Sequence, residues 1–337
     1  MAGSRARSFA DGAAVLAAAL LLGACSSEVD ALQATPAAGP SDTAPAEPTS
    51  APVEPPPPVP EVPYPIVLEH GMAGWDSIAG YEYFYRVKET LSAAGYAAFT
   101  TRVDPYNAIG ARGIELARLI DDILAQTGAN KVHLVGHSQG GLDARYVVST
   151  LGYGDRVATV TTLASPHQGC KLVDVALGLV PGAAVAAMAA LFDVFAGPLT
   201  GTESDLAAQL ADVTHANMTE AFNPANPDDP RVAYYSWTGW TQANPFVDTA
   251  ATDIVNPMFL SSRLLTELIE GTNDGLVGLS SAKWGTYFGA VPADHLDEVG
   301  LLTESSDPAF DHLDFFLRLA AFLYGQGEPP VYDTTME

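Results

Sequence analysis

The stretch KVHLVGHSQGGLDARYV, Lys131–Val147, predicts a strand that passes directly into a helix. Its apolar run Val132–Val135 is typical of a buried strand, and a helix-like segment follows Ser138. Between them, Gly136-His137-Ser138-Gln139-Gly140 fits the pattern G-x-S-x-G. That pattern describes a strained strand-to-helix turn, in which glycines two residues either side of the serine avoid clashes. A serine held out on such a turn is a candidate nucleophile, so Ser138 is the first catalytic prediction.

Charge and composition limit the class of partner. Of 337 residues, 40 are acidic and 15 basic, which gives a formal net charge of −25, and hydrophobic residues make up 48%. A core is therefore feasible, whereas nucleic acid, anionic membranes and polyanionic substrates would be repelled. Neutral or cationic substrates fit this surface better.

The first 25 residues read as an export signal. Arg5 and Arg7 precede the apolar run Ala13–Leu22, which is too short to span a bilayer comfortably. Leu22-Gly23-Ala24-Cys25 then resembles a lipobox, in which the cysteine becomes the acylated N-terminus of a bacterial lipoprotein. We therefore expect an exported lipoprotein anchored through Cys25 at the outer membrane or cell surface. An ordinary secretory signal cut near Ala24 is the alternative, and would give a freely secreted protein.

Residues 26–63 form a Pro-rich stretch that cannot bury surface and should be an extended tether. The folded domain is expected over residues 64–327, with a tail over 328–337. Besides Cys25 the chain has only Cys170, so a domain with an acylated Cys25 has no internal disulfide. A small buried residue is the expected role of Cys170.

Strand-like and helix-like segments alternate along the domain. This order predicts an α/β fold class with a mostly parallel sheet and helices on both faces. The expected strands are Tyr64–Leu68, Ala97–Val103, Val132–Val135, Val157–Leu163, Val232–Trp237 and Thr286–Val291. The expected helices are Tyr81–Ala94, Gly110–Thr127, the segment after Ser138 and Ala309–Leu323.

One region departs from the alternation. Leu172–Ala196 is almost wholly apolar, but Pro181-Gly182 and two carboxylates make a membrane span a poor interpretation. A buried core helix and a helical lid over an apolar site, about residues 172–223, both remain open.

A serine hydroxyl needs a base, and the base needs an orienting acid. In α/β-hydrolases the acid and then the histidine follow the serine. Downstream histidines are His167, His215, His295 and His312. His295 follows a predicted strand in a loop, where catalytic residues are common, whereas His312 falls in the predicted terminal helix. We therefore predict His295 as the base.

For the acid, Asp274 lies in the turn Gly271–Gly275 shortly before the histidine loop, and an exposed turn is expected there. Rival carboxylates between serine and histidine are Asp248, Asp253 and Glu270. The oxyanion of the reaction needs backbone N–H donors. Gln139 would supply one and the loop His70-Gly71-Met72 the other, with His70 as a structural residue of that loop.

Several motifs in order resemble the bacterial true lipases of the Pseudomonas, Burkholderia and Proteus type. They are YPIVLEHGMAGWDSIAGYEYFY, GHSQGGLDARYV, ASPHQG, YYSWTG, NDGLVG and DHLDEV, and they extend from Tyr64 to about Tyr324. The resemblance implies an α/β-hydrolase that cleaves acylglycerol esters at lipid–water interfaces. It matches Ser138, Asp274 and His295 to the catalytic positions, and Met72 and Gln139 to the oxyanion donors.

The resemblance also implies a structural calcium ion, for which Asp297 and Asn256 are the matching candidates, with Asp253 near the latter. No cofactor is required for the chemistry. Many family members carry a disulfide and need a dedicated chaperone. With no spare cysteine pair, this chain is closer to the disulfide-free branch, and a dedicated foldase is not expected.

The sequence thus predicts a serine ester hydrolase, with triacylglycerol lipase as the leading hypothesis. The enzymatic alternative is a carboxylesterase or polyester hydrolase that uses the same triad. The alternative from another class is a surface lipoprotein that keeps the fold and only binds. An intact triad and oxyanion pair argue against that last alternative.

Overall fold

The computed structural model describes residues 62–74, 77–78, 81–178, 205–242, 259–301 and 310–336, all within the compact unit 58–337. The expected signal, Cys25, nearly all of the tether, residues 179–204 of the predicted lid and Asn256 lie outside the described residues. Among the described helices, none combines the length and apolarity needed to cross a bilayer.

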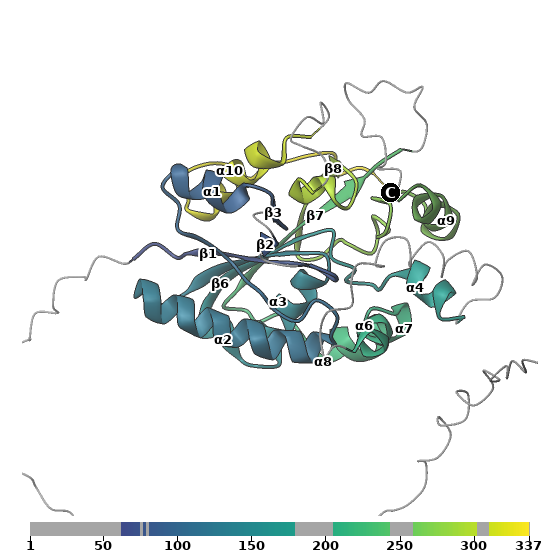
Figure 1. Cartoon of the computed structure of the whole chain (residues 1–337), viewed down its shortest axis with the longest axis horizontal. Coiled ribbons are helices and arrows are strands. Elements are labelled where there is room, and N and C mark those ends of the chain that lie inside the picture. The colour runs from purple at the N-terminus through teal and green to yellow at the C-terminus, as the bar shows by residue number, and fades with distance from the viewer. Residues whose placement is uncertain are drawn as a thin grey trace, which may run out of the picture. The chain divides into compact units, whose positions relative to one another are not determined.

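A six-stranded sheet with the order β4-β1-β5-β6-β7-β8 forms the centre of the fold (Figure 1). Every neighbouring pair in it is parallel. Its strands are β1 (Ile66–Glu69), β4 (Ala98–Thr100), β5 (Val132–His137), β6 (Val157–Leu163), β7 (Ala233–Trp240) and β8 (Thr286–Pro292). The predicted parallel α/β architecture is confirmed.

Helices cover both faces of this sheet because successive strand residues point to opposite sides. On one face, Leu68 and Val135 pack with α1 (Val87–Ala93) and α10 (His312–Leu323). On the other face, Val67 and Leu134 pack with α2 (Ile109–Thr127) and α3 (Gln139–Ser149). Figure 1 shows the two helix pairs on opposite sides of the strands.

A third group of helices includes the described parts of the predicted lid region. It comprises α4 (Lys171–Ala176), α6 (Leu206–Asp212), α7 (His215–Asn217), α8 (Asn223–Ala225) and α9 (Leu260–Glu270). A π-helical turn, Met218–Phe222, joins α7 to α8. Single 3₁₀ turns occur at Tyr153–Asp155 and Asp297–Val299. Leu172 and Val173 of α4 join Phe259 in a separate apolar cluster.

The predicted helix Tyr81–Ala94 is wrong in its first half. Tyr81–Glu82 forms β3, which pairs antiparallel with β2 (Ser77–Ile78), and the helix begins only at Val87. Arg86, immediately before it, has a φ of 58°, in the left-handed region that an α-helix of L-residues excludes. The chain must therefore turn at Arg86 before α1 can start.

Candidate active site

Ser138 lies at the turn between β5 and α3, as the sequence predicts. Its backbone angles are φ 56° and ψ −128°, a strained conformation for a residue with a side chain. A Cβ atom at Gly136 would lie 2.4 Å from the backbone nitrogen of Gly141, and one at Gly140 would lie 2.4 Å from the carbonyl oxygen of Glu69. Only glycine fits at these two positions, so the motif is built as a nucleophile elbow.

His295 and Asp274 form a buried pair. The Nδ1–H of His295 donates to Asp274 Oδ2 at 2.7 Å, and the two residues are 4% and 1% exposed. The backbone N–H of His295 also donates to the carbonyl of Asp274 at 2.9 Å. Because Nδ1 carries the proton, Nε2 of the neutral ring keeps its lone pair and can accept one. The pair has the chemistry of a base with its orienting acid.

The turn that carries Asp274 is buried, so the expectation of an exposed turn is wrong. Asp274 Oδ1 accepts backbone N–H groups from Leu276 at 2.8 Å and Val277 at 2.7 Å. These bonds satisfy a carboxylate that the fold withdraws from water. The polar residues of the turn suggest exposure, but the backbone N–H groups that follow Asp274 supply the hydrogen-bond partners that water would otherwise provide.

His137, directly before Ser138, joins this group. Its ring centroid lies 4.5 Å from that of His295, and both side chains are buried. His137 Nε2 lies 3.0 Å from Glu298 Oε2 and Nδ1 lies 2.7 Å from the Tyr83 hydroxyl. A carboxylate only accepts, so Nε2–H donates to Glu298 and Nδ1 accepts from Tyr83. Burial, helped by the adjacent His295, lowers the pKa of His137 well below its usual value, so its ring is neutral.

The loop His70-Gly71-Met72 lies against the nucleophile. A Cβ atom at Gly71 would come within 2.7 Å of Ser138 Cβ, so no larger residue fits there. His70 is 1% exposed, its Nδ1–H donates to the Gly71 carbonyl at 2.8 Å, and burial lowers its pKa to about 3. A ring so resistant to protonation supports the predicted structural role of His70 and makes it a poor base.

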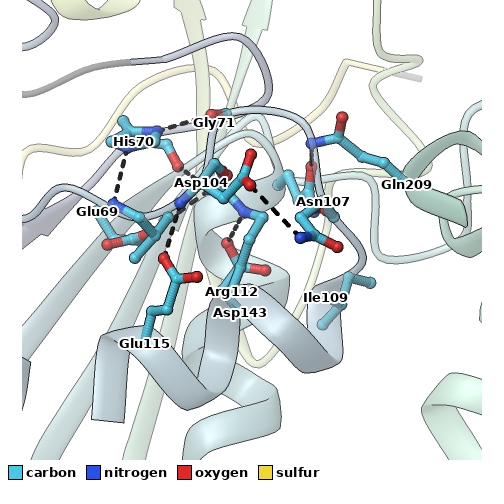
Figure 2. A network of polar contacts seen from close by, with 12 residues as sticks. Glu69, His70, Gly71, Asp104, Asn107, Ile109, Arg112, Glu115, Asp143 and Gln209 are labelled. Atoms are coloured by element: carbon cyan, nitrogen blue, oxygen red, sulfur yellow. Dashed lines mark hydrogen bonds and ion pairs between the residues drawn. The ribbon is translucent and has the colours of Figure 1, made fainter. Parts of the chain in front are cut away.

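A buried polar network supports this loop from below (Figure 2). Arg112 on α2 donates to the His70 carbonyl at 2.6 Å and to the Asp104 carbonyl at 2.7 Å. It also pairs with Glu69 at 3.4 Å and with Asp143 at 2.7 Å. Two buried carboxylates share one guanidinium, and burial raises the pKa of both, that of Glu69 to about 8.

An apolar pocket opens beside Ser138. It encloses about 350 Å³ of unfilled space, part of it open to solvent, and includes both predicted oxyanion donors, Met72 and Gln139. The remaining lining residues are Pro166, Cys170, Val173, Val213, Leu276 and Val277. Cys170 is 4% exposed and burial raises its thiol pKa, as expected for a small core residue.

Known proteins resemble this chain in sequence and in fold. A profile of the alpha/beta hydrolase fold matches residues 64–283. A triacylglycerol lipase of Vibrio cholerae is 32% identical over 267 residues, which cover 71% of this chain and 80% of that protein. The chain belongs to the bacterial lipase family of α/β-hydrolases.

More distant relatives agree with this membership. A triacylglycerol lipase of Pseudomonas fragi is 28% identical, with 78% of this chain and 97% of that protein covered. Among solved structures, a mature Bacillus licheniformis lipase is 23% identical with a TM-score of 0.55, and covers 74% of this chain and 91% of that chain. At that identity the structure supports the fold alone. The chain is accordingly a serine ester hydrolase of the lipase type.

The rival candidates have other partners. Glu270 Oε1 accepts the backbone N–H of Lys171 at 2.9 Å. His167 contacts Thr162 and Arg145, and His215 Nδ1–H donates to the Gln168 carbonyl. His312 donates from Nε2 to the Tyr85 carbonyl at 3.0 Å. Asp248 and Asp253 lie outside the described residues.

Only one of the two predicted calcium ligands, Asp297, lies in the described part of the chain. Asp297 is 5% exposed and lies two residues after His295, but Asn256 lies outside the described residues. Within those residues, the one cluster of three metal-ligating side chains is His137, His295 and Glu298. Calcium prefers oxygen ligands, so a cluster with two imidazoles does not fit it.

Sequence reasoning missed Tyr83, Glu298, Arg112 and Gln209, which all contact the site or its supports. Of these four, Arg112 had the clearest sequence signal. Its partner Glu69 ends an apolar strand, and a carboxylate buried there needs a cation. Glu298 stands beside Asp297, but no local pattern connects it with His137. Gln209 lies in a mixed helix of the predicted lid region and gave no signal at all.

Proposed function

We propose that this chain hydrolyses carboxylic esters of acylglycerols through an acyl-enzyme on Ser138. The observation that carries the proposal is the buried 2.7 Å bond from His295 Nδ1 to Asp274 Oδ2, with the His295 ring against the residue that precedes Ser138. The relatives named as triacylglycerol lipases suggest the substrate class.

In the proposed reaction, His295 Nε2 takes the proton of the Ser138 hydroxyl as its oxygen attacks the ester carbonyl. Asp274 fixes the tautomer of His295 and stabilises the imidazolium that forms. The backbone N–H groups of Met72 and Gln139 bind the oxyanion. His295 returns its proton to the leaving alcohol, and water activated by the same ring then releases the fatty acid. Every step uses the chain's own groups and water.

The substrate test compares two esters. Initial rates are measured on an emulsified long-chain triacylglycerol and on a dissolved short-chain ester, with Ser138→Ala as the control. A high rate on the emulsion that the substitution abolishes supports a lipase. Hydrolysis of the dissolved ester alone would make the chain a carboxylesterase or a polyester hydrolase. Ester hydrolysis absent from the folded wild type would revive the binding lipoprotein.

The lid is a second part of the proposal. Cys170, just before the apolar region, and Val173, within it, line the pocket beside Ser138, which supports a lid role for the region of about residues 172–223. Deletion or polar substitution of residues 179–196 is expected to reduce the rate on emulsions more than the rate on dissolved ester. Equal rates before and after the change would assign the region to the core.

Lipid anchoring and calcium binding are further proposals. If Cys25 is acylated after export, whole cells fed an alkyne-tagged fatty acid should label the wild type, whereas Cys25→Ala should remain unlabelled and leave the membrane fraction. If Asp297 and Asn256 hold calcium, removal of the ion with EGTA should lower the Tm, and calcium should restore it. An unchanged Tm would discard the calcium site.

A further inference from the structure

Gln209 is a buried amide far from Ser138 in sequence but attached to its surroundings in space. It lies on α6, directly after the undescribed residues 179–204, and is 0% exposed. Its Nε2 group donates to Gln139 Oε1 at 2.7 Å and to the Pro105 carbonyl at 3.1 Å. Figure 2 shows its side chain reaching from the helix toward the loop that carries Asn107.

Both acceptors belong to supports of the proposed oxyanion hole. The Pro105 carbonyl also accepts the backbone N–H of Ala73 at 2.9 Å, and Ala73 follows Met72. Gln139 is the other proposed donor residue, and its own Nε2 group donates to the Asn107 carbonyl at 3.1 Å. One amide therefore connects the loop behind Met72 with the side chain of Gln139.

The remaining atom of this amide indicates a role beyond packing. Within the described residues, Gln209 Oε1 is buried and has no hydrogen-bond partner. A buried carbonyl without a partner destabilises the folded state, so its presence at this position calls for an explanation. A functional role is one such explanation, and the two acceptors of the Gln209 amide show where that role would act.

We propose that Gln209 is a positioning residue that aligns the two backbone donors of the oxyanion hole. The proposal rests on the assignment of Met72 and Gln139 as those donors. When α6 is docked, the two Nε2 hydrogen bonds hold the Pro105 carbonyl and the Gln139 side chain in a fixed relation. Because hydrogen-bond strength depends steeply on geometry, small shifts of either donor weaken transition-state binding more than substrate binding.

The first experiment substitutes Gln209→Met, which removes both donors and keeps most of the volume. On a dissolved short-chain p-nitrophenyl ester, kcat is expected to fall about tenfold or more with KM within about twofold, since loss of a whole oxyanion donor costs about 10²–10³-fold. Affinity for a trifluoromethyl ketone inhibitor, whose adduct carries an oxyanion, should fall by the same factor. A raised KM with unchanged kcat, or unchanged kinetics, would overturn the proposal.

Asp212→Ala is the matched control, because Asp212 also fastens α6 to the chain, at the first residue of α2, just after the loop that carries Pro105 and Asn107. Its Oδ2 accepts the backbone N–H of Ile109 at 2.8 Å and contacts neither oxyanion support. This variant is expected to lower the Tm and to leave kcat unchanged. If both variants reduced kcat equally, Gln209 would only secure the helix and the positioning role would be wrong.

Gln139→Met removes the acceptor of the Gln209–Gln139 hydrogen bond. It also provides the test if Gln209→Met does not fold. It retains the backbone N–H and should reproduce the loss of kcat, whereas unchanged kcat would contradict the proposal. The double variant should lose no more than either single one, because the two side chains act as a unit. Ser138→Ala distinguishes failure of the proposed function from failure of the positioning role. Full activity in that variant would reject the proposed function itself.

Discussion

The chain contains the tripeptide His-Leu-Asp twice, at His295–Asp297 and at His312–Asp314, and the two copies have different fates. Both histidines are buried, at 4% and 3% exposed. His295 lies in the loop after β8 and donates to the carboxylate of Asp274. His312 begins α10 and donates from Nε2 to the Tyr85 carbonyl, whereas His295 donates from Nδ1.

The comparison teaches that partner and tautomer, more than burial, distinguish the proposed base from a structural histidine. A proton on Nδ1 leaves Nε2 of His295 able to accept another, and the carboxylate stabilises the resulting charge. A carbonyl partner holds the proton of His312 on Nε2 and offers no compensating charge. Burial accordingly lowers the pKa of His312 below its ordinary value.

Substitution of the first histidine should have the largest effect. His295→Ala removes the proposed base and is expected to lower kcat by about 10⁶-fold, with the fold retained. Rates on a dissolved ester measure the loss of kcat, and the circular dichroism spectrum shows whether the fold is retained. Activity within about tenfold of the wild type would mean that another residue is the base.

The acid partner comes next. Asp274→Asn places an amide donor against His295 Nδ1, which favours the wrong tautomer, and kcat should fall by about 10⁴-fold. KM on the same dissolved ester should change little. A similar loss in the control Asp314→Asn, on the second tripeptide, would mean that the effect is unrelated to the triad.

Stability should respond at the second histidine. His312→Leu removes the hydrogen bond from His312 Nε2 to the part-buried Tyr85 carbonyl and should lower the free energy of unfolding by about 0.5–1.5 kcal/mol, while kcat is unchanged. Urea denaturation at pH 7 and pH 5 measures this.

The gap between wild type and His312→Leu should narrow at pH 5. The pKa of folded His312 is lowered, so the unfolded chain takes up its proton first as the pH falls through about 6.5. This destabilises the wild type alone. A gap that widens on acidification would contradict a neutral, buried His312.

The smallest effect is expected at the aspartate of the second tripeptide. The Asp314 side chain is 61% exposed and pairs with Arg318 at 4.0 Å, one helical turn away. Asp314→Ala should therefore change the free energy of unfolding by only about 0.3–0.5 kcal/mol, less at high salt. A loss above about 1 kcal/mol in urea denaturation would show an unrecognised role.

Local signals predicted most of the fold. The periodic helix Gly110–Thr127 and the strand Val157–Leu163 agree with α2 and β6 to within a residue, because each encodes its own burial pattern. The start of α1 was predicted wrongly because the left-handed conformation of Arg86 depends on how the chain packs there. β5 and β7 extend beyond their apolar runs to His137 and Trp240, since pairing with neighbouring strands continues after the apolar signal ends.

The sequence by itself determined the class of chemistry. The spacing of Gly136, Ser138 and Gly140 predicts the elbow, because a strained turn restricts which residues can flank it. Chain order and loop position similarly led to His295 and Asp274. These are local constraints, and a sequence records local constraints directly.

Only the tertiary structure decided which groups support that chemistry. It placed Glu298 and Tyr83 on either side of His137, Arg112 beneath the loop of His70, and Gln209 across Pro105 and Gln139. Each contact joins segments distant in the chain. Most buried polar groups need a partner, and these partners come together through space, where no sequence spacing can record them.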